Sequence, residues 1–232
     1  MITITAFKWV PPFAQGQVRD HRVRWVLNEV GWPYQVKLLD SEDQRSDAYR
    51  ADQPFGQVPV MAEDGRPTLF ETGAIVLDVA LRSGTLLPQD EGERGLALSF
   101  HFAALNSIEP FLMNLAEVDF FMTDEAQKKA RRPGVVKMVE QRLGALERAL
   151  GDREYLVGGL FTVADLMTAS VLKIARSVEI LPRFPRLDAW QARICERPAY
   201  RKAIADQCDV FAKHSPRDMK YPPEVIRQFE AG

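Results

Sequence analysis

The chain has 232 residues, of which 30 are basic and 32 acidic, and its formal net charge is -2. That length can bury a sizeable core and suits one large domain or two modest ones. The balanced charge gives no bulk electrostatic reason to bind nucleic acid or anionic lipid. No run of about 18 apolar residues and no secretory-type start occurs, so we expect a cytoplasmic protein without nucleic-acid or membrane partners.

Neither the cysteines nor the histidines form a metal-binding pattern. Cys195 and Cys208 both fall in helical sequence and lack the spacing of metal ligands, so we expect free thiols. His21, His101 and His214 are scattered along the chain and form no paired motif. The sequence therefore predicts no metal.

The first third of the chain alternates strand and helix patterns. Residues 2–7 alternate as a half-buried strand does, and apolar residues recur at helical spacing up to Val30, where Gly31 can end the helix. We then expect a strand at 34–39, a loop with a short helix at 41–53, a strand at 58–62, and a helix at 72–82 that Gly84 can end. Strand, helix, strand, helix, two strands and helix is an order that fits a thioredoxin-like α/β sandwich.

Beyond Gly84 the strand signals stop. We place a first domain at residues 1–84, a linker at 85–92, and an all-helical domain with a carboxyl-terminal extension at 93–232. The clearest helical seam indicates core packing rather than a binding site, and it consists of Val139, Leu143, Leu146 and Leu150, closed by Gly151.

Thr162 and Asp165 stand three residues apart before an apolar helical run. This pattern is typical of a capping box, in which the Thr162 hydroxyl caps the helix and the Asp165 carboxylate accepts from the Thr162 N–H. We expect a structural role, with a loss of about 1 kcal/mol when Asp165 is replaced by alanine.

The most informative segments are Val58-Pro59 and Glu71-Thr72. Pro59 lacks an N–H, so it belongs on an edge strand or beside a ligand. A cis peptide bond between Val58 and Pro59 would leave the N–H and C=O of Val58 free to pair with the backbone of a bound peptide. Thr72 is a candidate N-cap at a helix start that favours a carboxylate, and Glu71 can accept from an ammonium. Together these segments predict a site for a small acidic peptide.

At these residues the chain resembles the cytosolic glutathione transferases. The matching stretches read Pro54-Phe55-Gly56-Gln57-Val58-Pro59-Val60 and Leu69-Phe70-Glu71-Thr72-Gly73-Ala74-Ile75. The resemblance covers residues 1 to about 205 and implies a thioredoxin-like domain followed by an all-α domain, glutathione as co-substrate, and a homodimer. The segment 206–232 lies outside it and either wraps the domain, covers the site or is a solvated extension.

The resemblance also implies roles for individual residues. Val58, before a cis Pro59, would hold the cysteinyl backbone of glutathione. Glu71 and Thr72 would hold the γ-glutamyl end, with assistance from Gln57. Arg45 falls where relatives often carry a lysine for the glycyl carboxylate, and it either has that role or is a surface charge.

The usual hydroxyl or thiol donor of that family is missing, which makes this an atypical, bacterial-type member. No Ser, Thr, Tyr or Cys lies between Trp9 and Arg24, and Gln17 stands where many members have Ser or Cys. A donor matters because the thiolate is the nucleophile and an unperturbed thiol has a pKa of about 8.5.

Two substitutes for the donor remain. The first, which we favour, is the helix-start N–H groups of Gly16, Gln17 and Val18 together with the Gln17 amide. The second is a guanidinium, from Arg19 or Arg22. The alternative for Arg19, Asp20 and Arg22 is a solvated charged face.

Four residues are candidates for the wall of an electrophile pocket. Trp9 and Phe13 precede the first helix, while Ala103 and Ser107 share a face of the first long helix of the second domain. Each could instead be a core or loop anchor.

Three functions fit this sequence, in decreasing order of preference. In the first, bound glutathione thiolate attacks an apolar electrophile. In the second, it attacks a disulfide substrate, so that the protein is a glutathione-dependent disulfide reductase. In the third, the chain binds glutathione or apolar ligands without catalysis.

Overall fold

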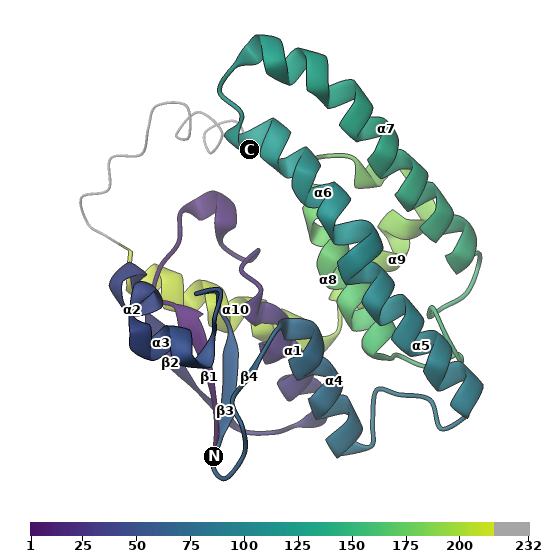
Figure 1. Cartoon of the computed structure of the whole chain (residues 1–232). Helices are drawn as coiled ribbons and strands as arrows, with labels where there is room; N and C mark the ends of the chain where they lie inside the picture. The colour runs from purple at the N-terminus through teal and green to yellow at the C-terminus, as the bar shows by residue number, and fades with distance from the viewer. Residues whose placement is uncertain (216–232) are drawn as a thin grey trace.

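A computed structural model describes residues 1–215. Figure 1 shows a small sheet with its helices beside a larger group of helices. Within the described residues the sheet has four strands in the order β2-β1-β3-β4, namely β1 (Ile2–Phe7), β2 (Tyr34–Leu39), β3 (Val60–Glu63) and β4 (Leu69–Phe70). β1 is parallel to β2 and antiparallel to β3, which is antiparallel to β4. The predicted α/β domain followed by a helical domain is confirmed.

The helices of the first domain follow the expected order. They are a short 3-10 turn η1 (Pro12–Ala14), α1 (Asp20–Val30), α2 (Ser41–Arg45), α3 (Asp47–Asp52) and α4 (Thr72–Ser83). Ile4 of β1, Val26 of α1 and Val79 of α4 are buried in one core, which holds both helices on the sheet. Gly31 and Gly84 end α1 and α4 as predicted, each with a φ of 69° that favours glycine.

The second domain is helical. Its elements are α5 (Glu91–Ala103), η2 (Ala104–Ile108), α6 (Glu109–Ala116), η3 (Glu117–Phe121), α7 (Glu125–Leu150), α8 (Val163–Ser177), η4 (Leu181–Arg183), α9 (Pro185–Cys195) and α10 (Pro198–Lys213). The segments η2 and η3 are π-helical, so α5 to η3 is one helical run. The predicted seam of α7 is buried, and Cys195 and Cys208 are free thiols as expected.

The run from Glu91 to Phe121 is also the one helix within residues 1–215 that is long and apolar enough to cross a membrane. Its residues Ala104, Leu112 and Leu115 are buried in the core that also contains Leu143 of α7. The core helix of a soluble domain passes the same test, so this is weak evidence for a membrane span.

The capping box at the start of α8 is confirmed. The Asp165 carboxylate accepts from the Thr162 N–H at 2.9 Å, and the Thr162 hydroxyl accepts from the Ala164 N–H at 3.2 Å. Asp165 is fully buried and also accepts from the Leu156 N–H, at 2.8 Å, and from the Thr162 hydroxyl, at 3.0 Å. Its carboxylate therefore ties the preceding loop to α8 in addition to capping the helix.

α10 runs back to the first domain and packs on α1 (Figure 1). Gln207 of α10 donates to Asp20 at 2.5 Å, and Asp20 accepts from Arg24 at 2.7 Å. Asp20 and Arg22 are buried, so the expectation of a solvated charged face is wrong for them: α10 covers Asp20, and α4 and α6 cover Arg22. Residues 206–213 thus belong to a packed helix, and the rest of the predicted extension, 216–232, lies outside the described residues.

Candidate functional site

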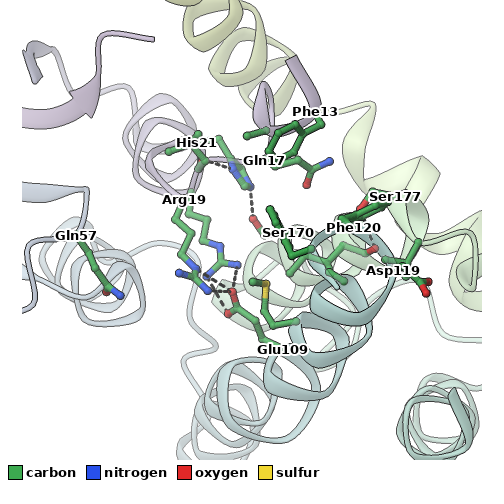
Figure 2. Close-up of a pocket in the computed structure, with 18 of the residues that line it drawn as sticks. Phe13, Gln17, Arg19, His21, Gln57, Glu109, Asp119, Phe120, Ser170 and Ser177 are labelled. Atoms are coloured by element: carbon green, nitrogen blue, oxygen red, sulfur yellow. Dashed lines mark hydrogen bonds and ion pairs between the residues drawn. The ribbon is translucent and has the colours of Figure 1, made fainter. Parts of the chain in front are cut away.

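Two adjoining cavities lie between the two domains. The first has a volume of about 800 Å³ and the second of about 660 Å³. Their common wall is formed by the start of α1, the segment before β3, and α6: Arg19, Arg22, Gln57, Val58, Glu109 and Met113. Figure 2 shows the first cavity, with Arg19 directed at Glu109 and with Gln57 on the opposite side from Phe120 and Ser177.

The second cavity contains the predicted peptide site. Val58, Pro59, Glu71 and Thr72 all line it, and the peptide bond between Val58 and Pro59 is cis. No hydrogen bond joins the Val58 backbone to another residue within 1–215, so its N–H and C=O are available. Pro59 directly precedes β3, an inner strand, and is therefore beside a cavity rather than on a sheet edge.

The N-cap of α4 is Glu71 rather than Thr72 as predicted, and Thr72 is the first residue of the helix. The backbone of Glu71 has a φ of 67° and a ψ of 115°, which is rare for a residue other than glycine. Strain of this kind concentrates at ligand-binding sites. No side chain of residues 1–215 caps α4, and the residues of its first turn line the second cavity, so their N–H groups are available there.

A buried carboxylate joins the two domains at the common wall. Glu109 of α6 accepts from Arg22 at 2.9 and 3.2 Å and from Arg19 at 2.9 Å. Burial alone would raise the pKa of Glu109, but Arg22 and then Arg19 hold it below its usual value, so the carboxylate is ionised. Arg22 also donates to the Thr72 hydroxyl at 3.4 Å, whereas the Arg19 side chain remains 42% exposed.

The turn before α1 carries the predicted thiol-activating groups. Gln17 and Val18 line the first cavity. The Gln17 N–H donates to the Ala14 carbonyl at 2.9 Å, so it is occupied. The Gly16 and Val18 N–H groups, in contrast, bond to no other residue in the described part of the chain. The prediction therefore needs one correction, because the available amides are those of Gly16 and Val18.

The sequence did not indicate that His21 and Ser170 belong to the same cavity. His21 Nε2 lies 2.5 Å from the Ser170 hydroxyl of α8, and His21 Nδ1 lies 2.8 Å from the Val18 carbonyl (Figure 2). Burial, with nearby Lys173 and Arg22, lowers the pKa of His21 well below its ordinary value. The imidazole is therefore neutral: Nδ1–H donates to Val18, and Nε2 accepts from Ser170.

The far part of the first cavity is aromatic. Phe13, Phe120 and Phe121 line it, and the Phe13 and Phe121 ring centroids are 5.9 Å apart in an edge-to-face arrangement. Phe13 thus lies where the electrophile pocket was expected. Trp9 lines neither cavity, so it is not part of this wall.

Ala103 and Ser107 also line neither cavity, which corrects their predicted place in the wall. For Ser107 the prediction assumed regular α-helical spacing, but the segment Ala104–Ile108 is π-helical, and a π turn holds one residue more than an α turn. Ala103 is the last residue of α5, directly before this segment. Leu105, Asn106 and Glu109 face the second cavity instead.

Arg45 is exposed and lines neither cavity. Its neighbour Gln44 lines the first cavity and donates to the Gly56 carbonyl at 2.5 Å. One residue along a helix turns a side chain by about 100°. Arg45 is therefore a surface charge, which was the alternative reading of the sequence.

Comparisons with known proteins assign the chain to a family. The sequence model described as "Glutathione S-transferase, N-terminal domain" matches residues 20–80, and the one described as "Glutathione S-transferase, C-terminal domain" matches residues 109–198. Glutathione S-transferase 3 of Schizosaccharomyces pombe is 26% identical over 237 residues, which cover 91% of this chain and 96% of that protein.

Solved structures share the fold. A glutathione transferase from Pseudomonas putida with one glutathione disulfide bound per subunit is 22% identical, with a TM-score of 0.76 over 88% of this chain and 90% of that one. A family member from Pseudomonas fluorescens with two glutathione bound is 24% identical, with a TM-score of 0.76 over 88% and 92%. With both domains matched in order, the chain belongs to the glutathione transferase family.

Proposed function

We propose that this protein binds glutathione in the second cavity and directs its thiolate toward an apolar electrophile in the first. One observation carries the proposal: the Val58 backbone and the first turn of α4, which no other group of residues 1–215 pairs or caps, line one cavity with the Glu71 carboxylate. A zwitterionic peptide carries a partner for each of them, namely its backbone, its ammonium and its carboxylate.

In this arrangement the cysteinyl backbone pairs with Val58, and the γ-glutamyl end lies between Glu71 and Thr72. The sulfur then points to the common wall, near Val18 and Arg19, which line the first cavity. The thiolate attacks the electrophilic carbon, a C–S bond forms, and the leaving group departs with its electron pair. Phe13 and Phe120 supply an apolar surface for the second substrate.

Replacing Glu71 with glutamine should raise the Kd for glutathione by at least about tenfold, because a charge-assisted hydrogen bond to the ammonium is lost. Isothermal titration calorimetry measures this. Glu42→Gln removes the same charge from an exposed position of α2 outside both cavities, and it should leave the Kd unchanged. Equal affinities of wild type and Glu71→Gln would remove Glu71 from the site.

Disulfide reduction is a second candidate, favoured by the two adjoining cavities with a common wall. In this reaction the glutathione thiolate attacks one sulfur of a disulfide, a new S–S bond forms, and a thiolate leaves. Turnover of a mixed disulfide of glutathione, without turnover of aryl halides, would favour this reaction over conjugation. Glutathione binding without turnover of either substrate would indicate the non-catalytic role.

We also propose that the protein is a homodimer. Phe102 and Leu77 line the second cavity, Phe102 is 48% exposed, and Leu81 of α4 is 60% exposed. A second copy on this α4–α5 face would cover these apolar side chains.

Light scattering after gel filtration should give twice the chain mass, and Phe102→Glu should give a monomer. Met138→Glu, at an exposed apolar residue of α7, should stay dimeric; a monomeric wild type would exclude the dimer.

A further inference from the structure

The carbonyl groups of the turn before α1 are held by side chains from the other domain and from α1 itself. Lys173 of α8 donates to the Gly16 carbonyl at 2.6 Å. Gln207 of α10 donates to the Val18 carbonyl at 2.9 Å, and His21 donates to the same oxygen at 2.8 Å. Both carbonyls are therefore occupied, and the orientation of their peptide groups is fixed.

The N–H groups of the same turn are left available. Those of Gly16, Val18 and Arg19 bond to no other residue among 1–215, and Val18 and Arg19 line the first cavity. Gln15, with a φ of -65° and a ψ of 133°, and Gly16, with a φ of 76°, fit a type II turn, which the Gln17 N–H closes on the Ala14 carbonyl. This turn leads into α1, where free N–H groups favour an anion and can do what the missing hydroxyl does in other family members.

We infer that Lys173 is a positioning residue, which holds this turn so that its free N–H groups receive the glutathione thiolate. The inference rests on the proposed function and deepens it, because it names the group that replaces the absent hydroxyl donor. Lys173 acts through the Gly16 carbonyl, since its side chain lines a separate small cavity behind Gln17 rather than the first cavity.

The charges around the turn favour an anion. Arg19, Arg22 and Lys173 are positive, and His21 is neutral. Within residues 1–215, Glu109 is the one carboxylate that pairs with the two arginines. Burial lowers the pKa of Lys173 to about 8. This value is still above 7, so Lys173 is mainly protonated at pH 7.

The other ionisable groups packed around Lys173 carry no net negative charge. Burial raises the pKa of Cys195, Cys208 and Tyr200, so these three side chains are neutral at pH 7. Arg176 on the same helix pairs with Asp188, and Asp20 pairs with Arg24. The positive excess therefore persists, and it lowers the free energy of a thiolate relative to a thiol.

The test is the thiol pKa of bound glutathione, followed by the ultraviolet absorbance of the thiolate across pH. In wild type we expect the pKa of the bound thiol to lie below the value of about 8.5 for a free thiol. In Lys173→Met we expect a pKa about one unit higher than in wild type, so that well below both pKa values the variant holds about tenfold less thiolate. Lys173→Arg keeps a charged donor and should restore the wild-type value. The Kd for S-methylglutathione, which has no ionisable thiol, should stay within about twofold in all variants.

Arg176→Met is the matched control, because Arg176 lies one turn along α8 and bonds to Asp188 and Gln191 instead of the turn. It should leave the bound thiol pKa at the wild-type value. An unchanged pKa in Lys173→Met, or an equal rise in Arg176→Met, would overturn the inference while glutathione binding stands. Failure of wild type to bind S-methylglutathione would overturn the proposed function itself. If Lys173→Met does not fold by circular dichroism, Lys173→Ala gives the same test, because it also removes both the donor and the charge.

Discussion

Replacing Glu109 with alanine should lower the free energy of unfolding by about 3–5 kcal/mol, because the change leaves buried charge without its partner. Arg22 is 2% exposed, and both of its terminal nitrogens donate to Glu109. Without the Glu109 carboxylate, the Arg22 guanidinium stays buried between the two domains. Its remaining hydrogen-bond partner within residues 1–215 is the Thr72 hydroxyl. Urea unfolding followed by circular dichroism measures the loss.

Asp119→Ala is the matched control for this variant. Asp119 pairs with Arg132 at 2.7 and 3.0 Å, also on the wall of the first cavity, but the Arg132 side chain is 42% exposed. Water can solvate that guanidinium after the substitution, so a loss below about 1 kcal/mol is expected. Similar losses in the two variants would contradict the view that burial makes Glu109 important.

The same carboxylate should contribute to acid unfolding. Its pKa is lower in the folded protein than in the unfolded chain, so it binds protons more weakly when folded. Its contribution to stability is therefore complete above the unfolded-state value of about 4.3 and is lost as pH falls through the lower folded-state value. Glu109→Ala should lose less stability than wild type between about pH 5 and pH 3.

Replacing Asp165 with alanine should lower the free energy of unfolding by about 3 kcal/mol, which is well above the about 1 kcal/mol of an ordinary helix cap. The N–H groups of Leu156 and Thr162 and the Thr162 hydroxyl would all lose a buried acceptor. Each buried donor left without an acceptor costs about 1–3 kcal/mol. Water that enters the space left by the carboxylate would lower this cost.

Asp124→Ala provides the comparison for Asp165. Asp124 caps α7 and accepts from the N–H groups of Ala126 and Gln127, but it lies at the surface. Water replaces it there, so about 1 kcal/mol or less should be lost. If the two substitutions cost the same in urea unfolding, the buried bond to Leu156 adds nothing to the cap.

The features that local sequence determines could be predicted. The strands at 2–7 and 34–39 follow from alternation, the ends of α1 and α4 from Gly31 and Gly84, and the capping box from the spacing of its two residues. That Val58-Pro59 and Glu71-Thr72 meet at one cavity could also be predicted, because each pair is recognisable within a few residues.

The contacts that complete the site could not be predicted, because they join residues far apart in the chain. Arg22 and Glu109 are 87 residues apart, His21 and Ser170 are 149 apart, and Lys173 and Gly16 are 157 apart. A charged first turn such as that of α1 is usually solvated, and only the packing of other helices on it, α10 at Asp20 and α4 and α6 at Arg22, reverses that expectation. Nothing within the turn itself signals this cover.

The π-helical segment Ala104–Ile108 determines where the length of this helical run can vary. A π turn holds one residue more than an α turn, so removing one residue here would restore α-helical spacing and leave Glu109 directed at the arginines of α1. The same deletion at the start of α6, which is regular α-helix, would rotate the residues after it by about 100° relative to those before it, and Met113 would leave the common wall. Neighbouring parts of one helical run therefore differ in the length changes they tolerate, and the exposed connection at 64–67 between β3 and β4 can gain or lose residues without reorienting the site.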